Sequence, residues 1–161
     1  MHPLSTVAPA FVDIAHRIVW ATVATTTPAG RPSTRVLHPI WEWNGSDLVG
    51  WIATAPTSPK ARHLAETPYA SVTYWDSSHD TCTADCEVEW LQTVDERRAI
   101  WDRFAAAPPP LGYDPRLIPA WTAPDVEAFG VIQLTPTSLR VMPGTLMLQG
   151  KGELLTWRRG A

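Results

Sequence analysis

Short runs of β-branched and aromatic residues recur along the chain, and each run ends near proline, glycine or asparagine. Such runs predict β-strands, and the residues between them predict tight turns. The Asn44-Gly45 pair favours a hairpin, because it readily supplies the positive φ angles that such a turn requires. We expect six strands, at residues 18–25, 33–43, 48–54, 70–75, 81–93 and 129–142.

Helical spacing of apolar residues interrupts this pattern at residues 9–17, 58–66 and 95–107. The second of these helices has clear start signals, with Ser58 as N-cap and Pro59 at the first helical position. Antiparallel strands joined by tight turns, with small helices between them, indicate a closed barrel rather than a sandwich or a parallel sheet. Residues 145–159 show no clear preference for helix or strand.

The length of 161 residues suits one domain, taken as residues 1–161. A formal net charge of -3 gives no strong attraction to nucleic acid or to an anionic membrane. No apolar run is long enough to span a bilayer, and Asp13, His16 and Arg17 precede the best apolar run, which argues against a secretory signal. We therefore expect a cytoplasmic protein without nucleic-acid or membrane partners.

Two residue types narrow the chemistry further. Cys82 and Cys86 are expected to be reduced thiols, since a zinc site would need more ligands than His79 and Asp85 supply, and no metal site is predicted. Most of the nine tryptophans are expected in the core or at a subunit interface, and one or two could flank a flat aromatic ligand.

The proline-rich residues 108–124 are expected to form an ordered loop.

Positive charge is placed where two predicted elements meet. Arg35 and His38 lie in an otherwise apolar strand, while Lys60 and Arg62 lie in the first turns of the helix that begins at Ser58. A helix start with hydroxyls and fixed cations has the composition of a phosphate site. The alternative is a solvated Arg35 at a strand edge and an ordinary surface lysine.

Two sequence runs resemble the pyridoxamine-phosphate-oxidase-like superfamily. They are Thr-Arg-Val-Leu-His-Pro-Ile-Trp at residues 34–41 and Ala-Thr-Ala-Pro-Thr-Ser-Pro-Lys at residues 53–60. The spacing from Thr54 to Lys60 is similar to that of the family, and the order of the following helix and strands also agrees. The resemblance covers roughly residues 20–104.

This resemblance implies a mainly β (α+β) fold, a six-stranded antiparallel split β-barrel of Greek-key type with small flanking helices. It also implies a homodimer with the cofactor at the subunit interface. By position, Arg35 and Lys60 would hold the FMN phosphate, with Thr54 and Ser58 as hydroxyl partners. The ring-side contacts would come from Val36, Leu37 and His38, and a position near Thr81 or Cys82 could also reach the ring.

One position departs from the family pattern. Pro59 stands where the family often has arginine, which removes a cation and a backbone donor from the phosphate site. Arg62, or Arg158 and Arg159, could compensate. Relatives that carry a run like the one at residues 38–41 bind the deazaflavin F-420 or haem-related ligands, so these cofactors remain alternatives to FMN.

The resulting hypothesis is an FMN-dependent oxidoreductase acting on an unidentified small substrate. The alternatives are an F-420-dependent reductase, a non-catalytic flavin or haem carrier or sensor, and a domain that has lost its cofactor. His38 is a candidate proton donor or base, or else a structural histidine. Residues 108–124, with Tyr113 and Trp121, are the expected substrate lid. The chain has no nucleophile elbow, Walker loop or Gly-x-Gly-x-x-Gly run, which disfavours hydrolases, P-loop enzymes and Rossmann dehydrogenases.

Overall fold

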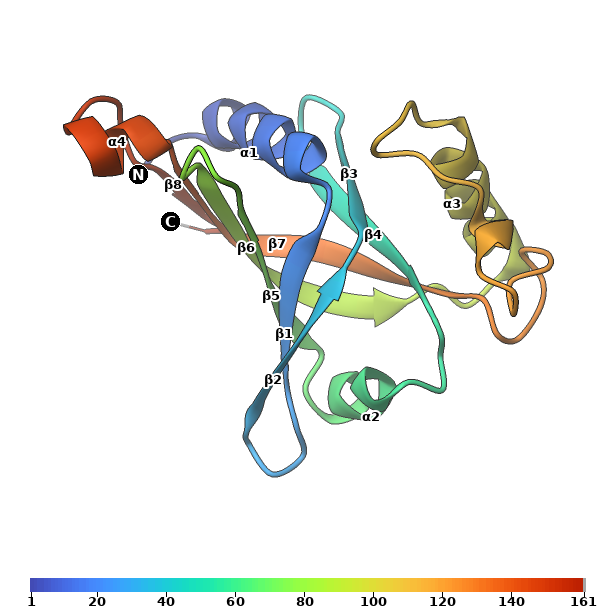
Figure 1. The fold of residues 1–161 in the computed structure, drawn as a ribbon. Coiled ribbons are helices and arrows are strands. Elements are labelled where there is room, and N and C mark those ends of the chain that lie inside the picture. Colours follow the sequence, from blue (N-terminus) through green and yellow to red (C-terminus); the bar gives the residue numbers. More distant parts are fainter. Residues whose placement is uncertain (161) are drawn as a thin grey trace.

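The computed structural model describes residues 1–160, and its centre is one antiparallel sheet of eight strands (Figure 1). The strand order is β2-β1-β5-β6-β7-β4-β3, and β8 pairs with β7. The strands are β1 (Ala21–Thr26), β2 (Pro32–Leu37), β3 (Pro39–Trp43), β4 (Leu48–Thr54), β5 (Tyr69–Trp75), β6 (Thr81–Trp90), β7 (Gly130–Met142) and β8 (Leu155–Arg158).

The two ends of the sheet are β2 and β3, which follow each other in the chain and are joined at His38. Within residues 1–160 these two strands do not pair, so the coiled sheet stays open along this line. The mainly β, antiparallel split barrel implied by the family resemblance is therefore confirmed, and the closed barrel expected from the strand and turn pattern alone is wrong. The predicted number of six strands is wrong, because residues 33–43 form two strands and the tail adds β8.

Five helical segments flank the sheet: α1 (Leu4–Ile18), α2 (Pro59–Glu66), α3 (Val94–Ala106), the short 3-10 helix η1 (Pro115–Leu117) and α4 (Gly144–Gln149). The main error concerns α1, which was expected to begin at Pro9 and begins five residues earlier. Val7, Ala8 and Phe11 are fully buried on its inner face, and this burial outweighs the hydrogen bond that a proline inside a helix removes. In the described part of the chain, no helix is long and apolar enough to cross a membrane.

The main core lies between α1 and the inner face of the sheet (Figure 1). Phe11 meets the ring of Trp41 edge-on, with centroids 4.9 Å apart, and the indole N–H of Trp41 donates to the Tyr74 hydroxyl at 2.8 Å. Gly50 on β4 faces Trp41 across the strand pair, and a Cβ there would lie 2.6 Å from the indole ring. The close approach of this ring to the backbone therefore requires glycine.

A second, smaller core joins α3 and the loop of residues 108–124 to the ends of β3 and β7. Phe129 is its centre, with the rings of Trp101 and Trp121 at 4.9 and 5.2 Å. The indole N–H of Trp121 also donates to the Ala128 carbonyl at 2.9 Å. The proline-rich segment is thus an ordered loop, as expected, and it is held beside the break between β2 and β3.

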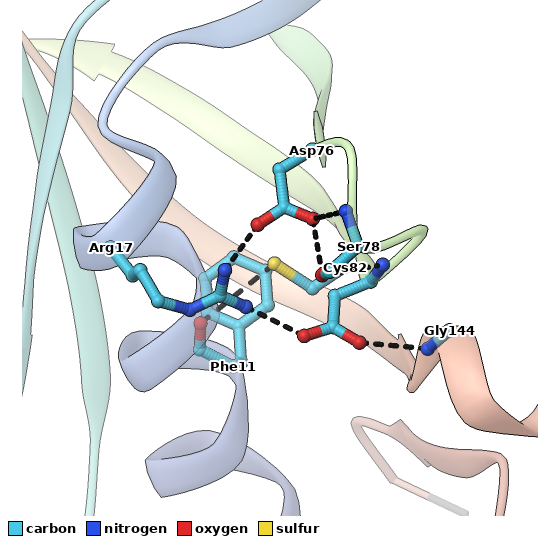
Figure 2. Close-up of polar contacts among 7 residues, drawn as sticks. Phe11, Arg17, Asp76, Ser78, Cys82 and Gly144 are labelled. Carbon is cyan, nitrogen blue, oxygen red and sulfur yellow. Dashed lines mark hydrogen bonds and ion pairs between the residues drawn. The ribbon is translucent and has the colours of Figure 1, made fainter.

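A polar network fastens the end of α1 to the turn between β5 and β6 (Figure 2). The guanidinium of Arg17 pairs with Asp76 and, at 2.7 Å, with Asp80. The second carboxylate oxygen of Asp80 accepts the backbone N–H of Gly144 at 2.7 Å, at the start of α4. Asp80 therefore has a structural role in holding α1 and α4 to this turn. The neighbouring His79 packs against Trp75, and neither residue lines the cavity described below.

Candidate functional site

Arg35 lies on edge strand β2, and its guanidinium reaches across to β1. It donates to the Val23 carbonyl at 3.0 Å, to the Thr25 hydroxyl at 2.8 Å and to the Ser33 hydroxyl at 3.1 Å. These contacts follow from the antiparallel register, in which Val23 faces Arg35 and Thr25 faces Ser33. They hold the guanidinium in place, and all three acceptors are uncharged.

Lys60 lies in the first turn of α2 and is only 8% exposed. Its ammonium group donates to the Ser58 hydroxyl at 2.8 Å, and that hydroxyl donates to the Ala55 carbonyl at 2.8 Å. Ser58 does occupy the N-cap position, and Pro59 is at the helix start as predicted. The side chain of Ser58 makes no cap hydrogen bond, however, and orients Lys60 instead.

The electrostatics of this pair are unusual. Within residues 1–160, no carboxylate forms an ion pair with either Arg35 or Lys60. Burial, and then the positive charge of Arg35, lower the pKa of Lys60, and burial lowers the pKa of Arg35. Two partly desolvated cations, one of which lowers the pKa of the other, favour a bound anion, which would offset both effects.

Two further polar residues complete this cluster and were missed by the sequence analysis. The Thr25 hydroxyl, which accepts from Arg35, also forms a hydrogen bond of 2.9 Å with Nδ1 of His63, and both residues are buried. A signal for each was present in the sequence. Thr25 continues the inward alternation of Ala21 and Val23, and His63 lies one helical turn after Lys60.

A cavity of about 470 Å³ lies next to this cluster, although neither Arg35 nor Lys60 is among the residues that line it. Ala55 connects the two features, because it lines the cavity and its carbonyl accepts the hydrogen bond from Ser58. None of the lining residues is Asp, Glu, Lys or Arg. The lining consists of Trp20, Val36, Leu37, His38, Ala53, Thr54, Ala55, Pro110, Tyr113, Leu117, Ile118 and Trp121.

The residues expected beside a ring cofactor thus line one cavity, together with Tyr113 and Trp121 of the expected lid. The His38 ring is placed between Trp20 and Tyr113, with both centroids 5.1 Å away. Burial lowers the pKa of His38, so the ring is neutral near pH 7. Its Nε2 is buried without a hydrogen-bond partner among the described residues.

The family comparison covers most of the chain. The family model described as pyridoxamine 5'-phosphate oxidase matches residues 7–142. The chain belongs to this family. No curated protein matches it.

Several solved structures resemble the chain over most of its length. A Clostridium acetobutylicum protein related to general stress protein 26 has a TM-score of 0.68 at 11% identity, over 91% of this chain and 90% of that one. An FMN binding protein from Nostoc punctiforme has a TM-score of 0.65 at 16% identity, over 100% and 99%. An F420 reductase has a TM-score of 0.56 at 17% identity, over 80% and 94%. At these identities the likeness shows the fold alone.

The cations considered as replacements for Pro59 have different surroundings. Arg159 pairs with Glu87 at 2.8 Å. Arg62, two residues after Lys60 on α2, and Arg158 on β8 are both exposed. The expectation that Cys82 could reach a ring is wrong, because its thiol is in the main core, 3.8 Å from the Phe11 carbonyl. Both cysteines are free and buried. In residues 1–160, no three His, Cys, Asp or Glu side chains form a group that could hold a metal ion.

Proposed function

We propose that this protein binds FMN and acts as an oxidoreductase on a small substrate. The observation that carries the proposal is the pair of Arg35 and Lys60, which has no carboxylate partner among residues 1–160 and adjoins an uncharged cavity. A phosphate would accept hydrogen bonds from both cations and restore local neutrality. Ser58 and Thr54 are the hydroxyl partners proposed for it.

The side of the cavity formed by β2 suits the rest of such a cofactor. Its volume of about 470 Å³ lies within the range of about 300–1,000 Å³ that is common for small-molecule sites. Val36 and Leu37 provide apolar contacts, and the β2 edge that carries them has backbone groups free for hydrogen bonding. Bound FMN would supply hydride chemistry, while the residues of this chain bind and orient it and restrict access of water.

The deazaflavin F-420 is the alternative cofactor. It is supported by the run His38-Pro39-Ile40-Trp41, by Pro59, and by the similarity of fold to an F420 reductase. A carrier or sensor without turnover is supported by the lining itself, which contains no Asp, Glu, Lys or Arg and one histidine, His38, whose pKa is lowered by burial.

We further propose a cytoplasmic homodimer with the cofactor between subunits. Trp20 and Val36 are 60% and 62% exposed where β1 and β2 reach the open side of the sheet. Large apolar side chains so placed are typical of surfaces that are covered in the assembled protein. Sedimentation or light scattering should give twice the mass of 17.8 kDa, and a monomer at micromolar concentration would contradict the dimer.

The decisive experiment is a cofactor titration. The absorption spectrum of the purified protein, and the mass of any molecule released by denaturation, identify a cofactor that co-purifies. FMN is then titrated into cofactor-free protein, and binding is followed by quenching of flavin fluorescence. Arg35→Ala and Lys60→Ala should each weaken binding about 10- to 100-fold, since a hydrogen bond to a charged group contributes about 1.5–3 kcal/mol.

Matched controls are available for both substitutions. Arg31 and Lys151 are exposed and lie outside the cluster, so Arg31→Ala and Lys151→Ala should leave FMN affinity unchanged. Unchanged affinity in Arg35→Ala and Lys60→Ala would refute the phosphate assignment. F-420 bound in place of FMN, with the same dependence on Arg35 and Lys60, would retain the site and change the cofactor.

A further inference from the structure

One wall of the cavity comes from the loop of residues 108–124, which contributes Pro110, Tyr113, Leu117, Ile118 and Trp121. The loop is anchored at both ends. The backbone N–H of Tyr113 donates to the Phe104 carbonyl at 3.0 Å, and the indole of Trp121 donates to the Ala128 carbonyl at 2.9 Å. Between these anchors, the Asp114 side chain accepts the Arg116 N–H and caps η1. The wall therefore has a defined shape.

This wall and the surface opposite carry no charge at neutral pH. None of the lining side chains is Asp, Glu, Lys or Arg. Burial lowers the pKa of His38 and raises the pKa of Tyr113 to about 12, so both side chains are neutral at pH 7. An anionic group that entered here would lose hydration without gaining a counter-charge, which is unfavourable.

The rim of the cavity is apolar and partly aromatic. Leu117 is 73% exposed and Ile118 is 43% exposed, although both line the cavity. The tilted rings of Trp20, His38 and Tyr113 form a continuous aromatic surface beside them. A flat apolar molecule would bury this exposed area and stack on the rings.

We propose that the loop side of the cavity selects an uncharged, flat and apolar substrate and disfavours a phosphorylated one. This inference rests on the proposed function, in which the cofactor phosphate occupies the cations Arg35 and Lys60. With those cations occupied, no lining side chain remains to neutralise a second phosphate. The substrate class would then differ from the phosphorylated compound that gives the family its name.

The test uses two probes that differ only by a phosphate, 1-naphthol and 1-naphthyl phosphate. Each is titrated calorimetrically into FMN-loaded protein. Naphthol should bind at least about tenfold more tightly than the phosphate, a difference of about 1.4 kcal/mol. Equal or tighter binding of naphthyl phosphate would refute the inference, as would failure of both probes to bind.

A charge placed on the wall provides the matched variant. Leu117→Arg should shift the ratio of the two dissociation constants about fivefold or more toward naphthyl phosphate, because it supplies the missing cation at an exposed position. Leu148→Arg is the control, since Leu148 is 60% exposed on α4 and does not line the cavity. An unchanged ratio in Leu117→Arg together with a changed molecular mass would assign Leu117 to a subunit contact and refute its place in a substrate site.

The two proposals can fail separately. FMN affinity is measured first by flavin fluorescence. Failure to bind FMN would refute the proposed function and the inference together. Tight FMN binding combined with a preference for naphthyl phosphate would refute only the proposed substrate class.

Discussion

The ammonium group of Lys60 donates a hydrogen bond to the Ser58 hydroxyl at 2.8 Å, and no carboxylate in residues 1–160 pairs with that ammonium. The serine in turn donates to the Ala55 carbonyl, at the edge of the cavity. A buried lysine is therefore held in a fixed direction by a neutral neighbour. We interpret Ser58 as the residue that positions Lys60 for an anion.

Ser58→Ala should weaken FMN binding by about tenfold, because it removes one proposed phosphate partner and frees the Lys60 ammonium. Flavin fluorescence titration measures the effect, and urea unfolding should show a smaller change in stability. Ser46→Ala, in the exposed hairpin turn, is the control. An FMN affinity equal in Ser58→Ala and Ser46→Ala would contradict the positioning role.

A second prediction concerns the contact of Gly50 with Trp41. Gly50→Ala should lower the free energy of unfolding by about 1–3 kcal/mol, because the added Cβ would overlap the indole ring. Urea denaturation measures this. Trp41→Phe is destabilising by itself, but the added effect of Gly50→Ala should be smaller in that background, since the overlapping ring is smaller. Strictly additive effects would show that the two residues do not interact.

The cation cluster was partly predictable from the sequence, because residue type and spacing indicate where a strand end meets a helix start. Arg35 and Lys60 were found in this way. Thr25 and His63 were not, because each hydrogen bond to them joins residues distant in sequence and depends on how β1, β2 and α2 pack. A hydroxyl on an inward strand position gives no local sign of its partner.

The strand errors have a different cause. The run at residues 33–43 looks continuous, since residues 34–37 and 40–41 all suit a strand. The chain nevertheless passes at His38 from β2, at one edge of the sheet, to β3, at the other edge. Pro39 follows directly, and it lacks the N–H that would continue the hydrogen bonds of β2. Likewise β8 has only four residues, too short a run to be recognised as a strand from the sequence, and it is defined by pairing with β7, from Leu155 with Val141 to Arg158 with Ser138. Such pairing depends on the tertiary fold.

The network of Figure 2 gives a stability prediction that should spare the proposed site. Asp80→Ala removes one of the two carboxylates that pair with Arg17 and leaves the Gly144 N–H without its acceptor. The exposed ion pair contributes little, but the lost acceptor should destabilise the fold by about 1–2 kcal/mol. Thermal unfolding measures the loss. FMN affinity should stay unchanged, and a large drop in affinity would connect this network to the cofactor site.

The last prediction concerns the stability of the fold at acidic pH. Burial lowers the pKa of His16 below its ordinary value of 6.5, and its Nε2 accepts the Trp41 backbone N–H at 3.0 Å, which requires that nitrogen to be unprotonated. As the pH falls below 6.5, the unfolded chain therefore takes up a proton at His16 before the folded protein does. The free energy of unfolding must then decrease as the pH falls. His38 contributes with the same sign, because burial also lowers its pKa.

His16→Gln separates these contributions, because glutamine retains an acceptor for the Trp41 N–H and cannot titrate. Urea unfolding of the wild type and of His16→Gln is compared between pH 7.5 and pH 5, a range of about one unit or more on each side of the ordinary histidine pKa. The wild type should lose more stability than the variant over this range, and the variant should retain the slope that belongs to His38. Parallel pH profiles would mean that His16 carries the same proton occupancy in the folded and unfolded states, in conflict with its buried acceptor role.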